Sequence, residues 1–258
     1  MHISLRNRLK PAIWQNVRRL AHAVRLLRYG GQAGVFRRYY RANQWGSLES
    51  VSGHGSTVQY TENIRLEIPL LLSKYQIKRI LDAPCGDYNW FRLILRPADV
   101  LYVGGDIVRE IVERNVRLFS NEKTHFLVLD ITRDPLPEVD LWMCRDCLLH
   151  LSNAAIFRVI TNFLTSPVEY FFASTYDECS SNQDTPTGGA RPVNLERPPF
   201  SFPQPILKVA DWIDGFPVRS MGLWSRKMLA EAVIGNEAAP RVLWDCAQKV
   251  LQGGKKED

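Results

Sequence analysis

The stretch Ile80-Leu81-Asp82-Ala83-Pro84-Cys85-Gly86-Asp87-Tyr88-Asn89-Trp90 runs from an apolar lead-in into an acidic turn that contains one glycine. A short apolar run of this kind predicts a strand that is buried on both faces. In open α/β sheets, ligands bind where such strands end and the chain turns towards a helix. We therefore interpret residues 80–90 as a buried strand followed by a ligand-binding loop.

The positive charge of the chain lies at its N-terminal end. The chain has 258 residues and a formal net charge of +6, but its first acidic residue is Glu49. Ten Arg and Lys residues precede Glu49, which leaves 23 basic against 27 acidic residues and a charge of −4 for the remainder. This distribution argues against a nucleic-acid-binding surface spread over the fold. The basic segment before Glu49 could instead bind phosphates or anionic lipid.

The five cysteines are an odd number in a chain too long to need disulfide bonds, so we expect free thiols and a reducing compartment. No apolar run approaches the ~20 residues that span a bilayer, and no continuous apolar core of a secretory signal is present at the N-terminus. We expect a cytoplasmic location, with peripheral membrane contact as an open alternative.

The N-terminal segment predicts a basic amphipathic helix. Apolar residues between Pro11 and Leu27 recur at three- and four-residue spacing, with arginines between them, until Gly30-Gly31 ends the pattern. Such a helix can pack on the main domain, lie in a membrane interface or act as a targeting peptide. We therefore divide the chain into a basic helical extension (1–41), a main domain (42–250) and a charged tail (251–258).

Helical and strand patterns alternate through the main domain after an irregular segment at 43–57, which is rich in small polar residues. The patterns predict helices at 61–75, 108–119, 148–164 and 225–232, a further apolar segment at 242–250, and strands beginning at residue 80 and at 100–105, 125–129, 139–143 and 168–174. This alternation is typical of an α/β fold with a mostly parallel sheet and helices on both faces. Residues 176–205 predict an irregular functional loop, with a stiff surface loop or a polyproline ligand as the alternatives.

Acidic residues follow three successive predicted strands. Asp82 lies in the opening stretch, Asp106 follows Gly86 by twenty residues, and Asp130 ends the third strand. A carboxylate at the end of the second strand can accept both hydroxyls of a ribose. Each acid alone is also explained as a helix cap or a surface charge, but the ordered set indicates a nucleoside-containing ligand.

These segments, together with Cys144-Arg145-Asp146-Cys147, resemble the class I S-adenosylmethionine-dependent methyltransferases between Trp45 and Trp224. The resemblance implies a Rossmann-like, seven-stranded, mostly parallel sheet and S-adenosyl-L-methionine as the cofactor. In this superfamily the first strand ends in acidic-x-Gly-x-Gly-x-Gly. Here the matching positions are Asp82, Pro84, Gly86 and Tyr88, so only the middle glycine is kept.

The resemblance implies a cofactor site made of Asp82, Ala83, Gly86, Asp87, Asp106, Ile107, Asp130, Ile131 and Arg145. It also implies that Asp130 contacts the adenine amino group. The carboxylate of Asp87 would repel a pyrophosphate, but it suits a ligand with an ammonium and a sulfonium. This argues for S-adenosylmethionine over NAD, and an NAD-dependent enzyme is kept as an alternative.

The catalytic candidates are Asp146 and His150, which lie four residues apart and would share a face on the first turn of the predicted helix at 148–164. The alternative is that Asp146 only caps that helix. Arg191, Asn194 and Phe200 of the irregular loop are the substrate-binding candidates, and they suit a polar acceptor such as a sugar or a small metabolite.

The function predicted from the resemblance is methyl transfer to an oxygen or nitrogen of a small-molecule or glycan acceptor, with no nucleic-acid partner. A catalytically degenerate methyltransferase fold that acts as a membrane-associated adaptor is the alternative of a different class. Cys144-x-x-Cys147-x-x-His150 also matches part of a zinc or redox motif, but a structural zinc needs four ligands and no second pair has suitable spacing. We therefore predict no metal.

Overall fold

The structure is a computed structural model that describes residues 30–253. The basic helix predicted between Pro11 and Leu27 and the last five residues of the charged tail lie outside the described residues. The three interpretations of the N-terminal helix are therefore not tested.

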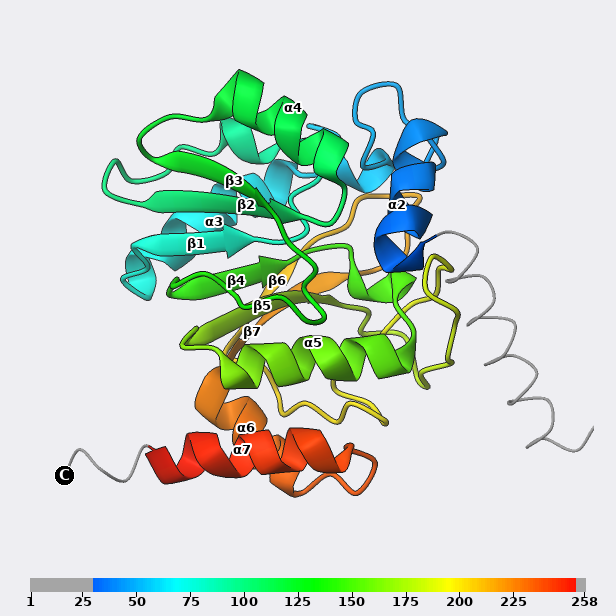
Figure 1. The fold of residues 1–258 in the computed structure, drawn as a ribbon, viewed down its shortest axis with the longest axis vertical. Helices are drawn as coiled ribbons and strands as arrows, with labels where there is room; N and C mark the ends of the chain where they lie inside the picture. The colour runs from blue at the N-terminus through cyan, green and yellow to red at the C-terminus, as the bar shows by residue number, and fades with distance from the viewer. Residues whose placement is uncertain (1–29, 254–258) are drawn as a thin grey trace, which may run out of the picture.

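A seven-stranded sheet with the strand order β3-β2-β1-β4-β5-β7-β6 forms the centre of the protein (Figure 1). Its strands are β1 (Arg79–Asp82), β2 (Leu101–Asp106), β3 (Thr124–Val128), β4 (Leu141–Cys144), β5 (Tyr170–Thr175), β6 (Leu207–Ala210) and β7 (Ser220–Ser225). Strand β7 pairs antiparallel with both β5 and β6, and the other neighbouring pairs are parallel. The predicted mostly parallel, seven-stranded sheet is confirmed.

The central strands are buried on both faces, as their continuous apolar sequences predict. In β4, Trp142 and Cys144 face one core cluster, while Leu141 and Met143 face the other. All four side chains are at most 1% exposed. Because full burial of one large apolar side chain contributes about 1.5–3 kcal/mol, this short strand is strongly fixed between the two layers.

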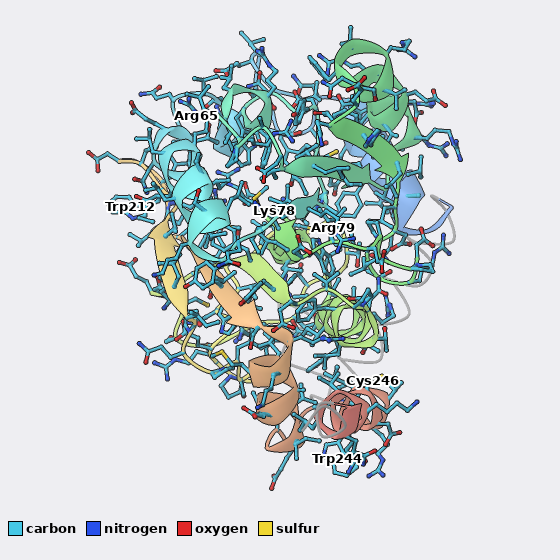
Figure 2. The ribbon with its side chains drawn as sticks, turned by 90° about the vertical axis from the view of Figure 1, so that its left-hand side faces the viewer. Arg65, Lys78, Arg79, Trp212, Trp244 and Cys246 are labelled. Atoms are coloured by element: carbon cyan, nitrogen blue, oxygen red, sulfur yellow. The ribbon has the colours of Figure 1, made fainter. Side chains whose placement is uncertain are left out.

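Six α-helices are described: α2 (Gly31–Arg41), α3 (Glu62–Lys74), α4 (Arg109–Phe119), α5 (Asn153–Thr165), α6 (Arg226–Ile234) and α7 (Arg241–Gly253). Short 3₁₀ turns are formed at His54–Ser56, Phe91–Leu93 and Leu148–His150. Helix α3, which carries Arg65, covers one face of the sheet, and α5, α6 and α7 form the layer against the other face (Figure 2). Helix α2 lies beside the ends of the strands (Figure 1).

Helix α3 begins directly after Thr61, as predicted, and continues through Pro69. Its buried apolar residues, Ile64, Ile68, Leu71 and Leu72, recur with helical spacing. The apolar side chains of Leu66 and Leu70 lie off this face and are 67% and 64% exposed. Two residues correspond to about 200° of helix rotation, so Leu66 and Leu70 lie opposite Ile64 and Ile68.

The predicted helix at 148–164 is shorter than its apolar pattern suggested. Residues Leu148–His150 form a 3₁₀ turn, and α5 begins only at Asn153. Ser152 caps α5 because its side chain accepts a hydrogen bond from the backbone N–H of Ala155. Asp146 and His150 therefore do not share a helical turn, and Asp146 does not cap the helix.

Strands β6 and β7 could not be located from the sequence, although the sheet was expected to have seven strands. In β6 only Val209 is buried, which is typical of an edge strand and leaves little apolar signal. Strand β7 contains Gly222, and the added Cβ of an alanine there would lie 2.3 Å from the Trp224 ring. Pairing with β5, rather than local preference, determines this strand.

The order of the strands reverses at β1, which lies between β2 and β4. In a parallel sheet this point leaves a crevice at the carboxyl ends of the strands. Asp82 and Asp106 are the last residues of β1 and β2, and Asp130 and Arg145 closely follow β3 and β4. The topology thus brings the predicted strand-end residues to one edge of the sheet.

We predict that Gly104→Ala in β2 lowers the free energy of unfolding by about 1–3 kcal/mol, because an added Cβ overpacks the layer between β2 and β3. The new atom would lie 2.5 Å from Cδ1 of Phe126 and 3.1 Å from Sγ of Cys85. Urea denaturation measures the change. Gly235→Ala is the control, because its Cβ would have no neighbour closer than 3.8 Å, and equal stability of the two variants would contradict the prediction.

Candidate active site

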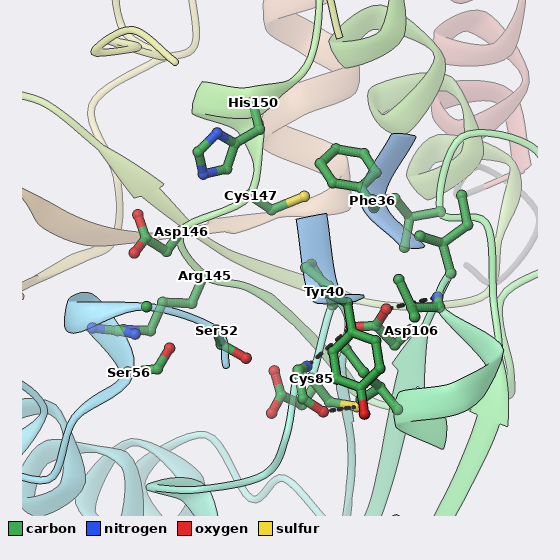
Figure 3. A pocket seen from close by; sticks show the side chains of 18 of the residues that line it. Phe36, Tyr40, Ser52, Ser56, Cys85, Asp106, Arg145, Asp146, Cys147 and His150 are labelled. Carbon is green, nitrogen blue, oxygen red and sulfur yellow. Dashed lines mark hydrogen bonds between the residues drawn. The ribbon is translucent and has the colours of Figure 1, made fainter. Parts of the chain in front are cut away.

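A cavity of about 260 Å³ opens at the carboxyl ends of the strands. Its walls come from four segments: the ends of β1 to β4, helix α2, the irregular segment at 45–56 and the loop at 145–151 (Figure 3). Of the nine predicted cofactor-binding residues, seven line this cavity: Asp82, Gly86, Asp106, Ile107, Asp130, Ile131 and Arg145. The exceptions are Ala83 and Asp87.

Asp82 is a buried carboxyl group at the end of β1. It is 2% exposed and accepts a hydrogen bond of 2.8 Å from the hydroxyl of Tyr102. Burial raises the pKa of Asp82 to about 7, and the hydrogen bond from Tyr102 and the charge of Arg145 only partly oppose this shift. The fold therefore holds a carboxyl group that changes its charge near neutral pH at the cavity wall.

Asp106 connects the ends of β1 and β2. Its Oδ2 accepts from the backbone N–H of Gly86 (3.1 Å), and its Oδ1 accepts from that of Val108 (2.9 Å). Burial raises the pKa of Asp106 to about 6, while these backbone hydrogen bonds lower it. An ionised carboxylate has about four lone-pair sites, so two are left for donors of a ligand in the cavity.

Asp130 follows β3 and is fixed by its neighbours. Its Oδ1 accepts from the backbone N–H and the hydroxyl of Thr132, and its Oδ2 lies 3.2 Å from Nε of Arg133. The same Thr132 hydroxyl accepts a hydrogen bond of 3.1 Å from Gln32 of α2. Helix α2 is thus tied to the wall beside Asp130.

The turn after β1 needs an unusual backbone conformation at two positions. Gly86 has φ +54°, and an added Cβ would lie 2.1 Å from Oγ of Ser52. Tyr88, which stands where the superfamily pattern has a glycine, also has a positive φ of 58°. Its ring packs between those of Tyr102 and Phe126 at centroid distances of 4.8 and 5.1 Å. Burial of this ring offsets the strain of about 1–2 kcal/mol, so the turn keeps its shape without the glycine.

The two predicted cofactor residues outside the cavity wall have structural contacts. The backbone N–H of Ala83 donates to Met143, and its carbonyl accepts from Nε1 of Trp142, so Ala83 joins β1 to β4. Asp87 was predicted to face the positive end of the cofactor. The structure instead places its carboxylate against residues 50–52, where it accepts from the Ser50 hydroxyl, the Val51 N–H and the Ser52 hydroxyl.

Asp87 thereby attaches the irregular segment to the turn after β1. Asn89 adds a second contact from the same turn, because its side-chain amide donates to Oε1 of Glu49 and to the carbonyl oxygen of Ser56. Between these anchors, Ser52, Gly53, His54, Gly55 and Ser56 line the cavity. The segment that precedes the fold in sequence is therefore a wall of the site. We call residues 47–56 the cover segment.

A buried network of four charged residues lies at the other end of the cavity. Asp211 accepts from Nε and Nη2 of Arg145 (3.2 and 2.8 Å), and it lies 2.9 Å from Nη2 of Arg219. Arg219 also binds Oδ1 of Asp146. Burial alone would raise the pKa of Asp146, but the charges of Arg219, Arg145 and His150 hold it below its usual value.

Asp146 has an unusual backbone conformation for a residue with a side chain, with φ +53°. Its backbone N–H donates to the hydroxyl of Ser174 (2.8 Å), which fixes the loop after β4 to β5. Such strain costs about 1–3 kcal/mol and is concentrated at functional sites. The carboxylate itself lines the cavity.

His150 lies on the same part of the cavity wall as Asp146 (Figure 3). Its Nδ1 donates to the carbonyl oxygen of Gly189 (2.8 Å), because a carbonyl can only accept. In the neutral ring, Nε2 is therefore the unprotonated nitrogen. The ring of Trp45 lies against His150 with the centroids 5.7 Å apart.

The three predicted substrate-binding residues do not line the cavity. Arg191 donates to the carbonyl oxygens of Leu148 and Leu149 at 2.9 Å each. Asn194 is buried and bonds within its own loop, and Phe200 is a core residue at 2% exposure. Arg191 and Asn194 hold the loop at 176–205 in place through these hydrogen bonds, and Phe200 anchors it in the core.

Sequence reasoning missed the contribution of α2 and of β7. Gln32, Phe36 and Tyr40 of α2 line the cavity, and their spacing of four residues is a signal that could have indicated a common face. No comparable signal connects Arg219 with Asp146, because they are 73 residues apart. Only the pairing of β7 with β5 brings them together.

Within residues 30–253, no group of three or more His, Cys, Asp or Glu side chains is arranged to hold a metal ion. All five cysteines are free, and Cys85, Cys144 and Cys147 are buried. Over the same residues, every helix is too short or too polar to cross a bilayer.

Comparison with solved structures identifies the fold. An S-adenosylmethionine-dependent methyltransferase from Leishmania major superposes with a TM-score of 0.57 at 16% identity, over 75% of this chain and 83% of that one. The fold is that of the class I methyltransferases. The N-methyltransferase NodS from Bradyrhizobium japonicum superposes with a TM-score of 0.50 at 11% identity, over 65% of this chain and 96% of that one. No protein-family model matches this methyltransferase-like chain, and no curated protein matches its sequence.

We predict that Asp82→Asn stabilises the protein by about 1–3 kcal/mol at pH 8 and by less at pH 4.5. The unfolded carboxyl ionises near 3.8 and the folded one near 7. The wild type therefore loses stability as the pH rises through this window, whereas an asparagine does not titrate and can still accept from Tyr102. Urea denaturation at several pH values tests this. The exposed Asp214→Asn is the control, and a pH-independent difference for Asp82→Asn would refute the assignment.

We predict that Asp87→Ala releases the cover segment, because three hydrogen bonds from residues 50–52 lose their acceptor. Amide hydrogen exchange over residues 47–56 should accelerate at least tenfold, and stability should fall by about 1–3 kcal/mol. Asp214→Ala serves as the matched exposed control. Unchanged exchange in the cover segment would show that Asp87 does not hold it.

Proposed function

We propose that this protein transfers a methyl group from S-adenosylmethionine to an oxygen or nitrogen atom of a small-molecule or glycan acceptor. The observation that carries the proposal is the ordered set of carboxyl groups in one cavity: Asp82, Asp106 and Asp130 at the ends of β1, β2 and β3. They lie in the crevice at the carboxyl ends of the strands of this methyltransferase fold. The fold and the side chains therefore both support S-adenosylmethionine as the ligand.

The residues present fit the proposed cofactor. Asp106 lines the cavity, and its carboxylate can accept further hydrogen bonds besides those from Gly86 and Val108, which suits the ribose hydroxyls. Gly86 lines the cavity in the turn that joins β1 to the cover segment, which suits contact with the methionine part. Asp130, between the apolar side chains of Leu129 and Ile131, suits an adenine that is held by its amino group and its ring.

The charge of the cavity supports the same assignment. Four carboxyl groups and one guanidinium line it, and the guanidinium of Arg145 is already paired with Asp211. Such a wall favours a ligand with a sulfonium and an ammonium over one with a pyrophosphate. When bound, S-adenosylmethionine supplies a methyl group whose carbon accepts the lone pair of the acceptor, while the electron pair of the broken C–S bond stays on sulfur.

His150 is the better of the two predicted catalytic bases. Its Nδ1 is occupied by the carbonyl oxygen of Gly189, so Nε2 can take a proton from the acceptor. Asp146 is a weak base by comparison, because Arg219 and Arg145 stabilise its ionised form and keep its pKa low. We assign proton acceptance to His150 and a role in holding the acceptor to Asp146.

The cover segment supports a small acceptor. It forms one wall of the cavity of about 260 Å³, with Ser52 to Ser56 beside Trp45, and this wall limits the space left for an acceptor. The surface of the main domain is also not basic overall, which agrees with an acceptor other than nucleic acid.

Calorimetric titration with S-adenosylhomocysteine tests the cofactor assignment. We expect binding to the wild type and a loss of about 1–3 kcal/mol, or roughly 5- to 150-fold in affinity, for Asp106→Ala. NADH is the competing ligand and should not bind. Asp214→Ala is the control for a surface carboxylate. Absence of S-adenosylhomocysteine binding to folded wild type, or binding of NADH instead, would overturn the proposal.

A further inference from the structure

We propose that the acceptor atom is the nitrogen of a small amine, and that the free carboxylate oxygen of Asp146 binds its N–H groups. This inference rests on the proposed methyltransferase function and assigns the acceptor class of the same site. It depends on which charged atoms of the buried network are accessible from the cavity.

The two oxygens of Asp146 have different surroundings. Oδ1 is bound by Nη1 of Arg219, which fixes the orientation of the carboxylate. Among residues 30–253, no hydrogen bond to Oδ2 is formed, although the carboxylate lines the cavity. One oxygen thus holds the side chain in place, and the other is left for a donor that the protein does not supply.

Gly55 of the cover segment keeps Oδ2 open. An added Cβ at Gly55 would lie 2.5 Å from Oδ2 of Asp146, well inside contact distance. Because Arg219 fixes the carboxylate, it could not turn away without losing that ion pair. The backbone of Gly55 does not have a positive φ, so its missing side chain matters here for space and not for conformation.

The accessible charge of the network is negative. The Asp146 side chain is 24% exposed, whereas those of Arg145 and Arg219 are 3% exposed each. Arg145 is covered by aromatic rings, with its guanidinium 5.0 Å from the centroid of Trp90 and 5.7 Å from that of Tyr60. A ligand in the cavity therefore meets the carboxylate in preference to either guanidinium.

An ionised carboxylate at this position selects among acceptor atoms. During methyl transfer the positive charge that leaves sulfur arrives on an amine nitrogen, and a nearby carboxylate stabilises it. A hydroxyl acceptor needs partial negative charge on its oxygen, and a carboxylate acceptor carries a full one. Asp146 would repel a carboxylate acceptor, and it would disfavour the negative charge that develops on a hydroxyl oxygen. The low pKa of Asp146 keeps this discrimination present at neutral pH.

The neighbouring side chains complete a site for a protonated amine. An ammonium group must lose one proton before its lone pair is available, and Nε2 of His150 can accept that proton and pass it to solvent. Trp45 and Trp90 line the same cavity and provide apolar and cation–π contacts for the rest of the molecule. Asp146 then holds the remaining N–H groups.

The test uses three probes of similar size that share a benzyl group and differ in the group attached to it: 2-phenylethylamine, 2-phenylethanol and phenylacetate. Each is titrated calorimetrically into the full chain, alone and saturated with S-adenosylhomocysteine. We expect the wild type to bind the amine at least about tenfold more tightly than the alcohol, and the alcohol more tightly than phenylacetate.

Two variants separate the effect of the charge of Asp146 from the effect of the accessibility of its Oδ2 to a ligand. Asp146→Asn removes the charge and keeps the shape, and Gly55→Ala keeps the charge but blocks Oδ2. Both should retain binding of S-adenosylhomocysteine and reduce the preference for the amine over the alcohol to less than about twofold. Asp214→Asn should keep the wild-type preference. Thermal unfolding verifies that each variant is folded.

Equal binding of amine and alcohol to the wild type would overturn the acceptor assignment, as would a preference that persists in both variants. Failure of S-adenosylhomocysteine to bind would instead overturn the cofactor assignment, while the preference among the three probes is still measured on the protein alone. The acceptor assignment and the cofactor assignment would therefore be contradicted by different observations.

Discussion

Burial of carboxyl groups where parallel strands end is the constraint on which the site depends. Parallel strands bring the residues at their carboxyl ends to one edge of the sheet, and the strands here are covered by helices on both faces. Asp82 and Asp106 are consequently removed from water, and their pKa values rise to about 7 and about 6. Their charged forms are destabilised by this burial, which favours a ligand that donates hydrogen bonds to them.

The buried network at the acceptor side has the opposite effect on its carboxylates. Two guanidinium groups and two carboxylates share one buried volume, and removing any partner would leave a charge without compensation. Arg219 keeps its positive charge despite burial, because Asp146 and Asp211 raise its pKa. The same ion pair keeps Asp146 ionised and orients one of its oxygens towards the cavity. Stability and the proposed choice of acceptor thus depend on the same contacts.

The cover segment links the two halves of the site. Asp87 lies in the turn after β1, which the sequence indicated as a cofactor loop, but its carboxylate binds residues 50–52 instead. The turn therefore positions the cover segment, and the cover segment brings Gly55 over Asp146. This coupling explains how a chain with only one of the expected glycines can form the turn, since Tyr88 is held by aromatic packing and Asp87 by the cover segment.

Local patterns in the sequence were sufficient for the fold class and for half of the site. The sequence indicates buried strands and the acidic side chains at their ends, as in Ile80-Leu81-Asp82 and at Asp106 and Asp130. Both features can be predicted because they depend on residues that are consecutive in the chain. The same reasoning did not reveal that the loop residues Arg191, Asn194 and Phe200 lie away from the cavity, because the identity of a side chain in a loop does not indicate which way it faces.

The sequence by itself determined the strands β1 to β5, the mostly parallel character of the sheet and the carboxylates at the strand ends, since these depend on periodicity and on spacing along the chain. Only the tertiary structure decided the partners of those groups. It brought Arg219, which directly precedes β7, to Asp146, turned Asp87 towards the cover segment and placed α2 against the cavity. These contacts join residues that are far apart in the chain. They cannot be predicted from local sequence patterns, because ion pairs and hydrogen bonds depend on distances in space.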